Sequence, residues 1–123
     1  MAKNLSLDVL VAKEVMGWDL SSNGTCFCID GEIIRDVSDW HPSSDMNDAW
    51  SVIEKLLRDG WELDEGIMKM DRLEHGGFVI ELNSSLLNPG SSDGPYVEAK
   101  TCQLAICRVA RIAKRMEAKN GSN

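Results

Sequence analysis

The chain has 123 residues, of which 43% are hydrophobic and 27% are charged, so its size and composition are those of one globular domain of about 100–150 residues. It carries 13 basic and 20 acidic residues, a formal net charge of −7. Because proteins bind polynucleotides through a surplus of Lys and Arg on one face, this charge argues against binding to a nucleic acid polymer.

The start of the chain and its cysteines indicate a cytosolic protein. Residues 1–4 (MAKN) are polar and lead into a helical pattern, unlike the apolar core of a secretion signal. No apolar run approaches the ~20 residues of a membrane span, so we expect no membrane partner. The cysteines form no C-x-x-C pair, so we expect small buried thiols, no metal and no cofactor. They are Cys26, Cys28, Cys102 and Cys107.

The first half of the chain predicts a helix followed by a hairpin. Apolar residues at helical spacing over 5–17 predict an amphipathic helix, with Ser6 as its N-cap and Gly17 as its C-cap. Over 24–36, two β-type runs flank Asp30-Gly31, a pair typical of two-residue turns in which both residues have positive φ. This segment predicts a short β-hairpin.

Residues 44–59 give the clearest helix signal in the chain. Ser44 or Asp45 caps the start, and Gly60 ends the helix. One apolar stripe is predicted to face the core; it consists of Met46, Ala49, Trp50, Ile53, Leu56 and Leu57.

The second half predicts two extended stretches, 61–70 and 78–82, separated by a turn at 74–77. A loop rich in Gly, Pro and Ser follows at 84–95, and a short extra strand is expected at 96–99. The last element is a helix over about 101–117. Its inward side is predicted to consist of Cys102, Ile106, Val109, Ile112, Ala113 and Met116.

The order α-ββ-α-ββ-α predicts an α+β fold, in which three amphipathic helices pack on a mainly antiparallel sheet. We expect a single domain over residues 1–119 and a flexible tail over 120–123.

The common catalytic motifs are missing from the sequence: it has no G-x-S-x-G, no Walker loop, no G-x-G-x-x-G and no H-E-x-x-H. We therefore expect no catalytic residue. His41 and His75 fall in predicted loops, and an enzyme in which His41 and Asp45 act together remains an alternative.

Two predicted helix starts, 40–45 and 98–101, have the chemistry of an anion site. Backbone amides at a helix start lack partners and carry partial positive charge, so they accept anions. Hydroxyl groups, a cation and a flat indole nearby could hold a phosphorylated, nucleotide-like ligand. The candidate ligand-binding residues are Trp40, Pro42, Ser43, Ser44, Asp45, Lys100, Thr101 and Arg108. The alternative is that these residues are ordinary helix caps and that Trp40 anchors the core.

Three blocks of sequence resemble the phage ABA sandwich domain family. They are residues 11–18 (VAKEVMGW), residues 42–56 with the pattern PSSD, AW and VIEKL, and residues 98–108 (EAKTCQLAICR). The blocks come in the family's order and span nearly the whole chain. The resemblance implies an αβα layered sandwich encoded by a phage or prophage, and it implies no enzyme activity.

From these features we expect a non-enzymatic phage accessory protein in the host cytoplasm that sequesters a small anionic ligand, such as a nucleotide signal of host immunity. The alternatives are a module that blocks or redirects a host protein through its acidic surface and the 84–95 loop, and a small enzyme. Self-association into a homo-oligomer is a further expectation.

Overall fold

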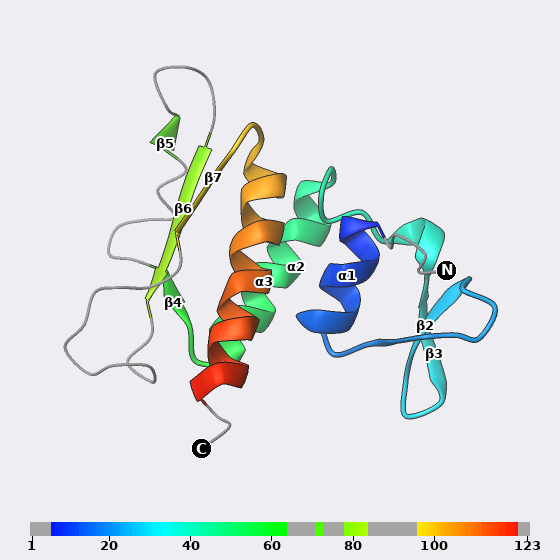
Figure 1. Ribbon diagram of the computed structural model, residues 1–123. Coiled ribbons are helices and arrows are strands. Elements are labelled where there is room, and N and C mark those ends of the chain that lie inside the picture. The colour runs from blue at the N-terminus through cyan, green and yellow to red at the C-terminus, as the bar shows by residue number, and fades with distance from the viewer. Residues whose placement is uncertain (1–5, 64–70, 73–77, 84–95, 121–123) are drawn as a thin grey trace, which may run out of the picture.

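The computed structural model describes residues 6–63, 71–72, 78–83 and 96–120 (Figure 1). Three α-helices lie in these ranges: α1 (Leu7–Glu14), α2 (Met46–Arg58) and α3 (Cys102–Asn120). The strands are β1 (Asp19–Leu20), β2 (Cys26–Ile29), β3 (Glu32–Asp36), β4 (Glu62–Leu63), β5 (Asp71–Arg72), β6 (Phe78–Asn83) and β7 (Tyr96–Ala99). One turn of 3₁₀ helix, η1 (Val37–Asp39), follows β3.

The strands form two antiparallel sheets. The first has the order β1-β2-β3, with Asp19 opposite Cys28 and Ile29 opposite Glu32. In the second, β6 is central and pairs antiparallel with the three other strands: β5 and β7 pair with its N-terminal part, and β4 pairs with its C-terminal end.

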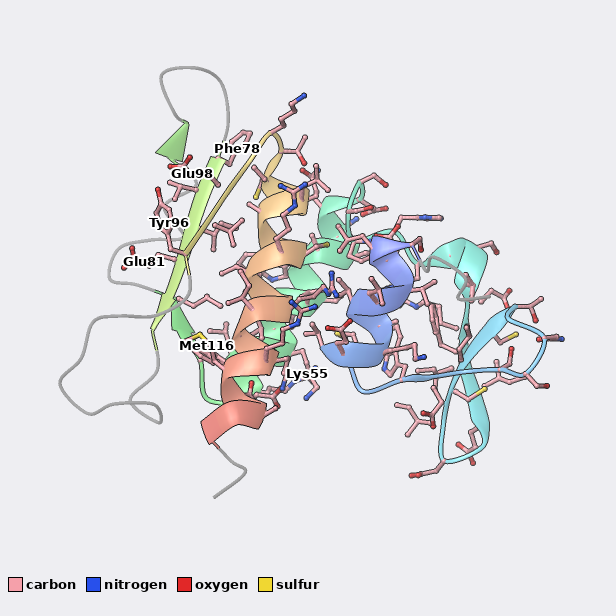
Figure 2. All side chains as sticks on the ribbon, viewed as in Figure 1. Lys55, Phe78, Glu81, Tyr96, Glu98 and Met116 are labelled. Atoms are coloured by element: carbon pink, nitrogen blue, oxygen red, sulfur yellow. The ribbon has the colours of Figure 1, made fainter. Side chains whose placement is uncertain are left out.

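The helices lie between the two sheets (Figure 1). Helix α3 packs on β6 and β7, α2 packs on α3, and α1 packs on α3 and β1. Figure 2 shows Glu81, Tyr96 and Glu98 on the side of the second sheet that faces away from α3. One buried core joins the three helices to both sheets. Its largest fully buried side chains include Trp40, Phe27, Ile53, Leu56, Ile80, Leu82 and Ile106.

Local signals in the sequence predicted where several elements begin and end. Ser6 caps α1, since its Oγ accepts a hydrogen bond from the Val9 amide at 3.3 Å. Asp30 and Gly31 turn the β2–β3 hairpin with φ of 50° and 84°, as the turn type requires. Gly17 and Gly60 also have positive φ, after α1 and α2 respectively. The predicted α+β class and the order of the three helices are confirmed.

Other details of the prediction were wrong. The predicted stripe of α2 is wider than its buried face, because Trp50 and Leu57 remain 40% and 42% exposed. On α3, Ile112 is exposed, and the helix is instead buried through small residues such as Ala105 and Ala110. Strands β1 and β5 were not predicted, because two-residue strands are too short to show an alternation of apolar and polar residues.

Some predictions fall on parts of the chain that the structure does not describe. The turn at 74–77, the loop at 84–95 and the tail residues 121–123 lie outside the described residues. Asn120, which was expected to begin the tail, is the last residue of α3. None of the described helices is both long enough and apolar enough to span a membrane.

Candidate functional site

The start of α2 is satisfied by the chain's own carboxylates. The Ser43 amide donates to Asp8 Oδ1 at 2.8 Å, and the Asn47 amide donates to Asp45 Oδ1 at the same distance. The His41 amide donates to Asp48 Oδ2 at 2.9 Å. Because amides in these positions are the donors that an anion would need, and the three aspartates add negative charge, this helix start favours capping over ligand binding.

Two further residues of the predicted site have structural roles in the same segment. Pro42 is fully buried. The Ser44 side chain is exposed, while its amide donates to the His41 carbonyl at 3.0 Å. These contacts also fit a capping segment.

The start of α3 carries the other half of the predicted site. Thr101 caps the helix, because its Oγ1 accepts a hydrogen bond from the Leu104 amide at 3.2 Å. Lys100 and Arg108 are exposed. Helices α2 and α3 pack together with their N-termini at the same end of the molecule, so both predicted segments do lie at one end (Figure 1). The assignment of the eight residues to one ligand site remains a prediction.

Trp40 is a core anchor that borders a cleft. The residue is 1% exposed, and its Nε1 donates to the Asp8 carbonyl at 2.9 Å. The Trp18 ring meets it edge-on, with 4.7 Å between ring centroids. An indole buried in this way offers a ligand little surface to stack on, so Trp40 contributes to the cleft mainly as part of its lining.

Arg35 lies across both indoles. Its Cζ is 5.2 Å from the centroid of the Trp40 ring and 5.9 Å from that of Trp18, distances at which a guanidinium is attracted to an aromatic face. Arg35 Nη1 also donates to Asp48 Oδ1 at 3.2 Å. A guanidinium held from two sides in this way has a defined orientation.

These groups line a cleft of about 260 Å³ between β3, α2 and the segment that follows α1. Ser51, Glu54 and Arg58 line it from α2, where spacings of three and four residues place them on one helix face. The full lining is Met16, Trp18, Arg35, Trp40, Ser51, Glu54 and Arg58. Among the described residues, neither Glu54 nor Arg58 forms an ion pair, and both side chains are exposed.

Of the eight predicted site residues, only Trp40 lines this cleft. Sequence reasoning missed Arg35 and Arg58. The spacing of Ser51, Glu54 and Arg58 along α2 was a usable signal for one wall of the cleft. No comparable signal linked Arg35 to that wall, since β3 and α2 meet only in the folded chain.

A second hollow, of about 500 Å³, lies beside β2 and η1. Its lining is Thr25, Cys26, Asp36, Val37 and Ser38, which provides a carboxylate and no basic side chain. This hollow is therefore unsuited to an anion.

The basic residues of α3 are largely occupied by ion pairs within the fold. Arg111 forms two hydrogen bonds with Glu14, at 3.2 and 3.0 Å, and Arg115 lies 3.8 Å from the same carboxylate. Lys114 pairs with Asp59 and with Glu117. These cations hold α3 to α1 and to the end of α2, which explains most of the basic cluster without a nucleic acid.

The remaining titratable and thiol groups form no recognisable centre in the part of the chain that the structure describes. His41 Nε2 contacts the Ser38 carbonyl at 2.6 Å, and its Nδ1 lies 3.9 Å from Asp8. Asp45, the partner considered for His41, is engaged in capping α2. Burial and the charge of Asp8 raise the pKa of the Cys107 thiol to about 12. No group of three or more potential metal ligands occurs among the described residues.

Comparison with known proteins gives a match to a sequence family and a solved structure of similar fold. The family model for the phage ABA sandwich domain matches residues 9–110. A crystal structure of a phage protein from Bacillus cereus ATCC 14579 is similar, with a TM-score of 0.55 at 19% identity. The match covers 92% of this chain and 96% of that one, and at this identity it is evidence for the fold alone. No curated protein matches the chain.

Proposed function

Because the chain belongs to the phage ABA sandwich domain family, we propose that it is a phage accessory protein that binds a small anionic ligand without converting it. The ligand lies in the cleft between β3, α2 and the segment after α1, where it contacts Arg35 and Arg58. The observation that carries the proposal is the pair of guanidinium groups on one cleft. Binding there replaces the earlier hypothesis of a site at the two helix starts.

Arginine suits this role because its planar group forms paired hydrogen bonds with phosphate or carboxylate oxygens. The indoles and Asp48 already restrict Arg35, so little side-chain entropy is lost when a ligand binds. The overall charge of −7 is compatible with such a ligand. A small anion interacts mainly with the two nearby arginines, whereas a polynucleotide interacts with a large part of the protein surface.

The biological role that follows is sequestration in the host cytoplasm. A protein that sequesters a signal needs affinity and abundance and needs no general base or nucleophile. A phosphorylated metabolite or a nucleotide signal of host immunity has the required charge.

Calorimetry and thermal unfolding with mononucleotides and inorganic phosphate test the proposal. A ligand at 100 times its Kd stabilises the folded state by about 2.7 kcal/mol, which for a chain of this size raises Tm by roughly 10 °C. If none of these compounds stabilises the protein or releases binding heat, the proposal is wrong.

A second candidate function is docking to a host protein through the β2–β3 hairpin. Three isoleucines near its turn are exposed, with Ile33 at 68%, Ile29 at 42% and Ile34 at 41%. Among the described residues β3 pairs only with β2, which leaves one edge open to another strand. The hairpin projects on the side of the helices opposite the second sheet (Figure 1).

A pull-down from host lysate, with the unmodified chain and the Ile33→Asp variant, tests this candidate. Loss of a specific partner with the variant supports docking at the hairpin. A partner retained by the variant places the contact elsewhere, and deletion of residues 84–95 then tests the loop. The molar mass in solution, measured in parallel, tests self-association.

A further inference from the structure

We propose that the ligand of the cleft is a guanine nucleotide, with Glu54 selecting the base and Arg58 binding the phosphate. The inference rests on the proposed function, because it takes the cleft between β3 and α2 as the binding site. It adds the chemical class of the ligand. The starting observation is that this cleft contains a carboxylate beside its two arginines.

Glu54 is unfavourable for a ligand that is only an anion. A carboxylate near a bound phosphate repels it, and a carboxylate that loses water without a hydrogen-bond donor loses free energy. Among the described residues Glu54 forms no ion pair, and Arg58 lies one helical turn further along the same face of α2. A ligand that fits all the charges of this cleft therefore carries a negative group at one end and hydrogen-bond donors at the other.

Guanine supplies such donors in the right form. Its N1–H and its exocyclic N2 amino group lie side by side on one edge and point in the same direction, which matches the two oxygens of a carboxylate. Adenine presents on the same edge one amino donor beside the N1 acceptor, and that acceptor would face a carboxylate oxygen. A site with a fixed acceptor pair discriminates strongly against an analogue that leaves one acceptor unpaired.

The other walls suit a flat ring of limited size. A base can stack on an arginine plane, and the Arg35 guanidinium lies over the Trp18 and Trp40 rings. The volume of about 260 Å³ is slightly below the range of roughly 300–1,000 Å³ that is usual for ligand pockets. The size favours a single nucleotide unit over a dinucleotide held completely within one cleft.

Titration calorimetry with GMP, IMP, AMP and inorganic phosphate on the full chain tests the inference. We expect GMP to bind tighter than AMP by roughly tenfold or more, and IMP, which lacks the N2 amino group, to fall between them. Equal affinities for GMP and AMP, or tighter binding of AMP, would overturn the guanine assignment and leave the anion site intact. No binding of any of the four would overturn both proposals.

The Glu54→Gln variant tests the residue that the inference names. The amide keeps the size of the side chain and loses one acceptor and the charge, so the preference for GMP over AMP should fall to about twofold or less. Glu32→Gln, an exposed change on β3 outside the cleft lining, is the matched control and should keep the full preference. A purely structural role of Glu54 would change both affinities by the same factor, and a preference unchanged in Glu54→Gln would contradict the assignment.

Discussion

The guanidinium of Arg35 lies over the indole of Trp40, with Cζ 5.2 Å from the ring centroid. The indole is fixed in turn by its hydrogen bond to the Asp8 carbonyl at the start of α1. The orientation of Arg35 in the cleft therefore depends, through Trp40, on how α1 packs against the segment before α2. The cleft is built on the core, so its geometry should persist as long as the core is intact.

Trp40→Phe should destabilise the protein by about 2 kcal/mol, because it removes buried atoms and leaves the Asp8 carbonyl without its donor. Urea unfolding followed by circular dichroism measures this change. The matched control is Trp50→Phe, since Trp50 is 40% exposed and its replacement should change the free energy of unfolding by less than about 0.5 kcal/mol. Equal losses for the two variants would mean that Trp40 is not an anchor.

Asp59 should make stability fall in acid. Burial raises the pKa of this carboxyl, but hydrogen bonds and charge from Lys114 and Lys55 outweigh burial and hold the pKa below its ordinary value. A folded-state pKa below the unfolded one stabilises the fold above the unfolded pKa, and this stabilisation is lost as pH falls through the folded pKa. The contribution is therefore complete near neutral pH, begins to fall below about pH 4, and is lost once the pH is below the folded-state pKa.

Asp59→Asn tests this ion pair. At pH 7 the variant should lose about 1–3 kcal/mol, because two lysines, Lys55 and Lys114, lose their carboxylate. The difference from the unmodified chain should shrink as the pH falls below about 4. Urea unfolding at pH 7, 5 and 3 measures it, and a difference that stays constant over this range would show that Asp59 is not charged in a stabilising pair.

The thiols should divide into two classes towards an aromatic disulfide reagent. Cys26 and Cys28 are partly exposed on β2 and should react in the folded protein. Cys102 and Cys107 are buried, and burial raises the pKa of both thiols, so they should react only on unfolding. The number of thiols that react in buffer and in denaturant measures this difference. Fast reaction of all four in buffer would contradict the packing of α3.

Local signals were enough to predict some of the boundaries of elements. The pair Asp30-Gly31 strongly favours a two-residue turn between two β-type runs, and a residue such as Asp45 before an apolar stripe is a typical helix cap. Which side of a stripe is buried depends on the neighbouring element. The period alone therefore could not show that Trp50 lies at the exposed margin of α2.

The candidate site could not be predicted because its contacts span large separations in sequence. Asp8 accepts the hydrogen bond from the Ser43 amide, 35 residues away, and this bond occupies a donor that appeared free in the sequence. In the same way, Arg35 and Arg58 line one cleft only in the folded chain, where β3 and α2 both border it. Of the residues that the sequence suggested for an anion site, Trp40 lines this cleft, and the cations suggested with it, Lys100 and Arg108, do not.

The central claim is that the cleft, and not the pair of helix starts, binds the ligand. Titration calorimetry of GMP with Arg58→Ala and Arg108→Ala tests it most directly, because both variants remove an exposed arginine from a helix and only Arg58 lines the cleft. Loss of one charge-assisted hydrogen bond should weaken binding to Arg58→Ala roughly tenfold or more, while Arg108→Ala should bind like the unmodified chain. Weakened binding to Arg108→Ala with full affinity in Arg58→Ala would contradict the claim and return the site to the start of α3.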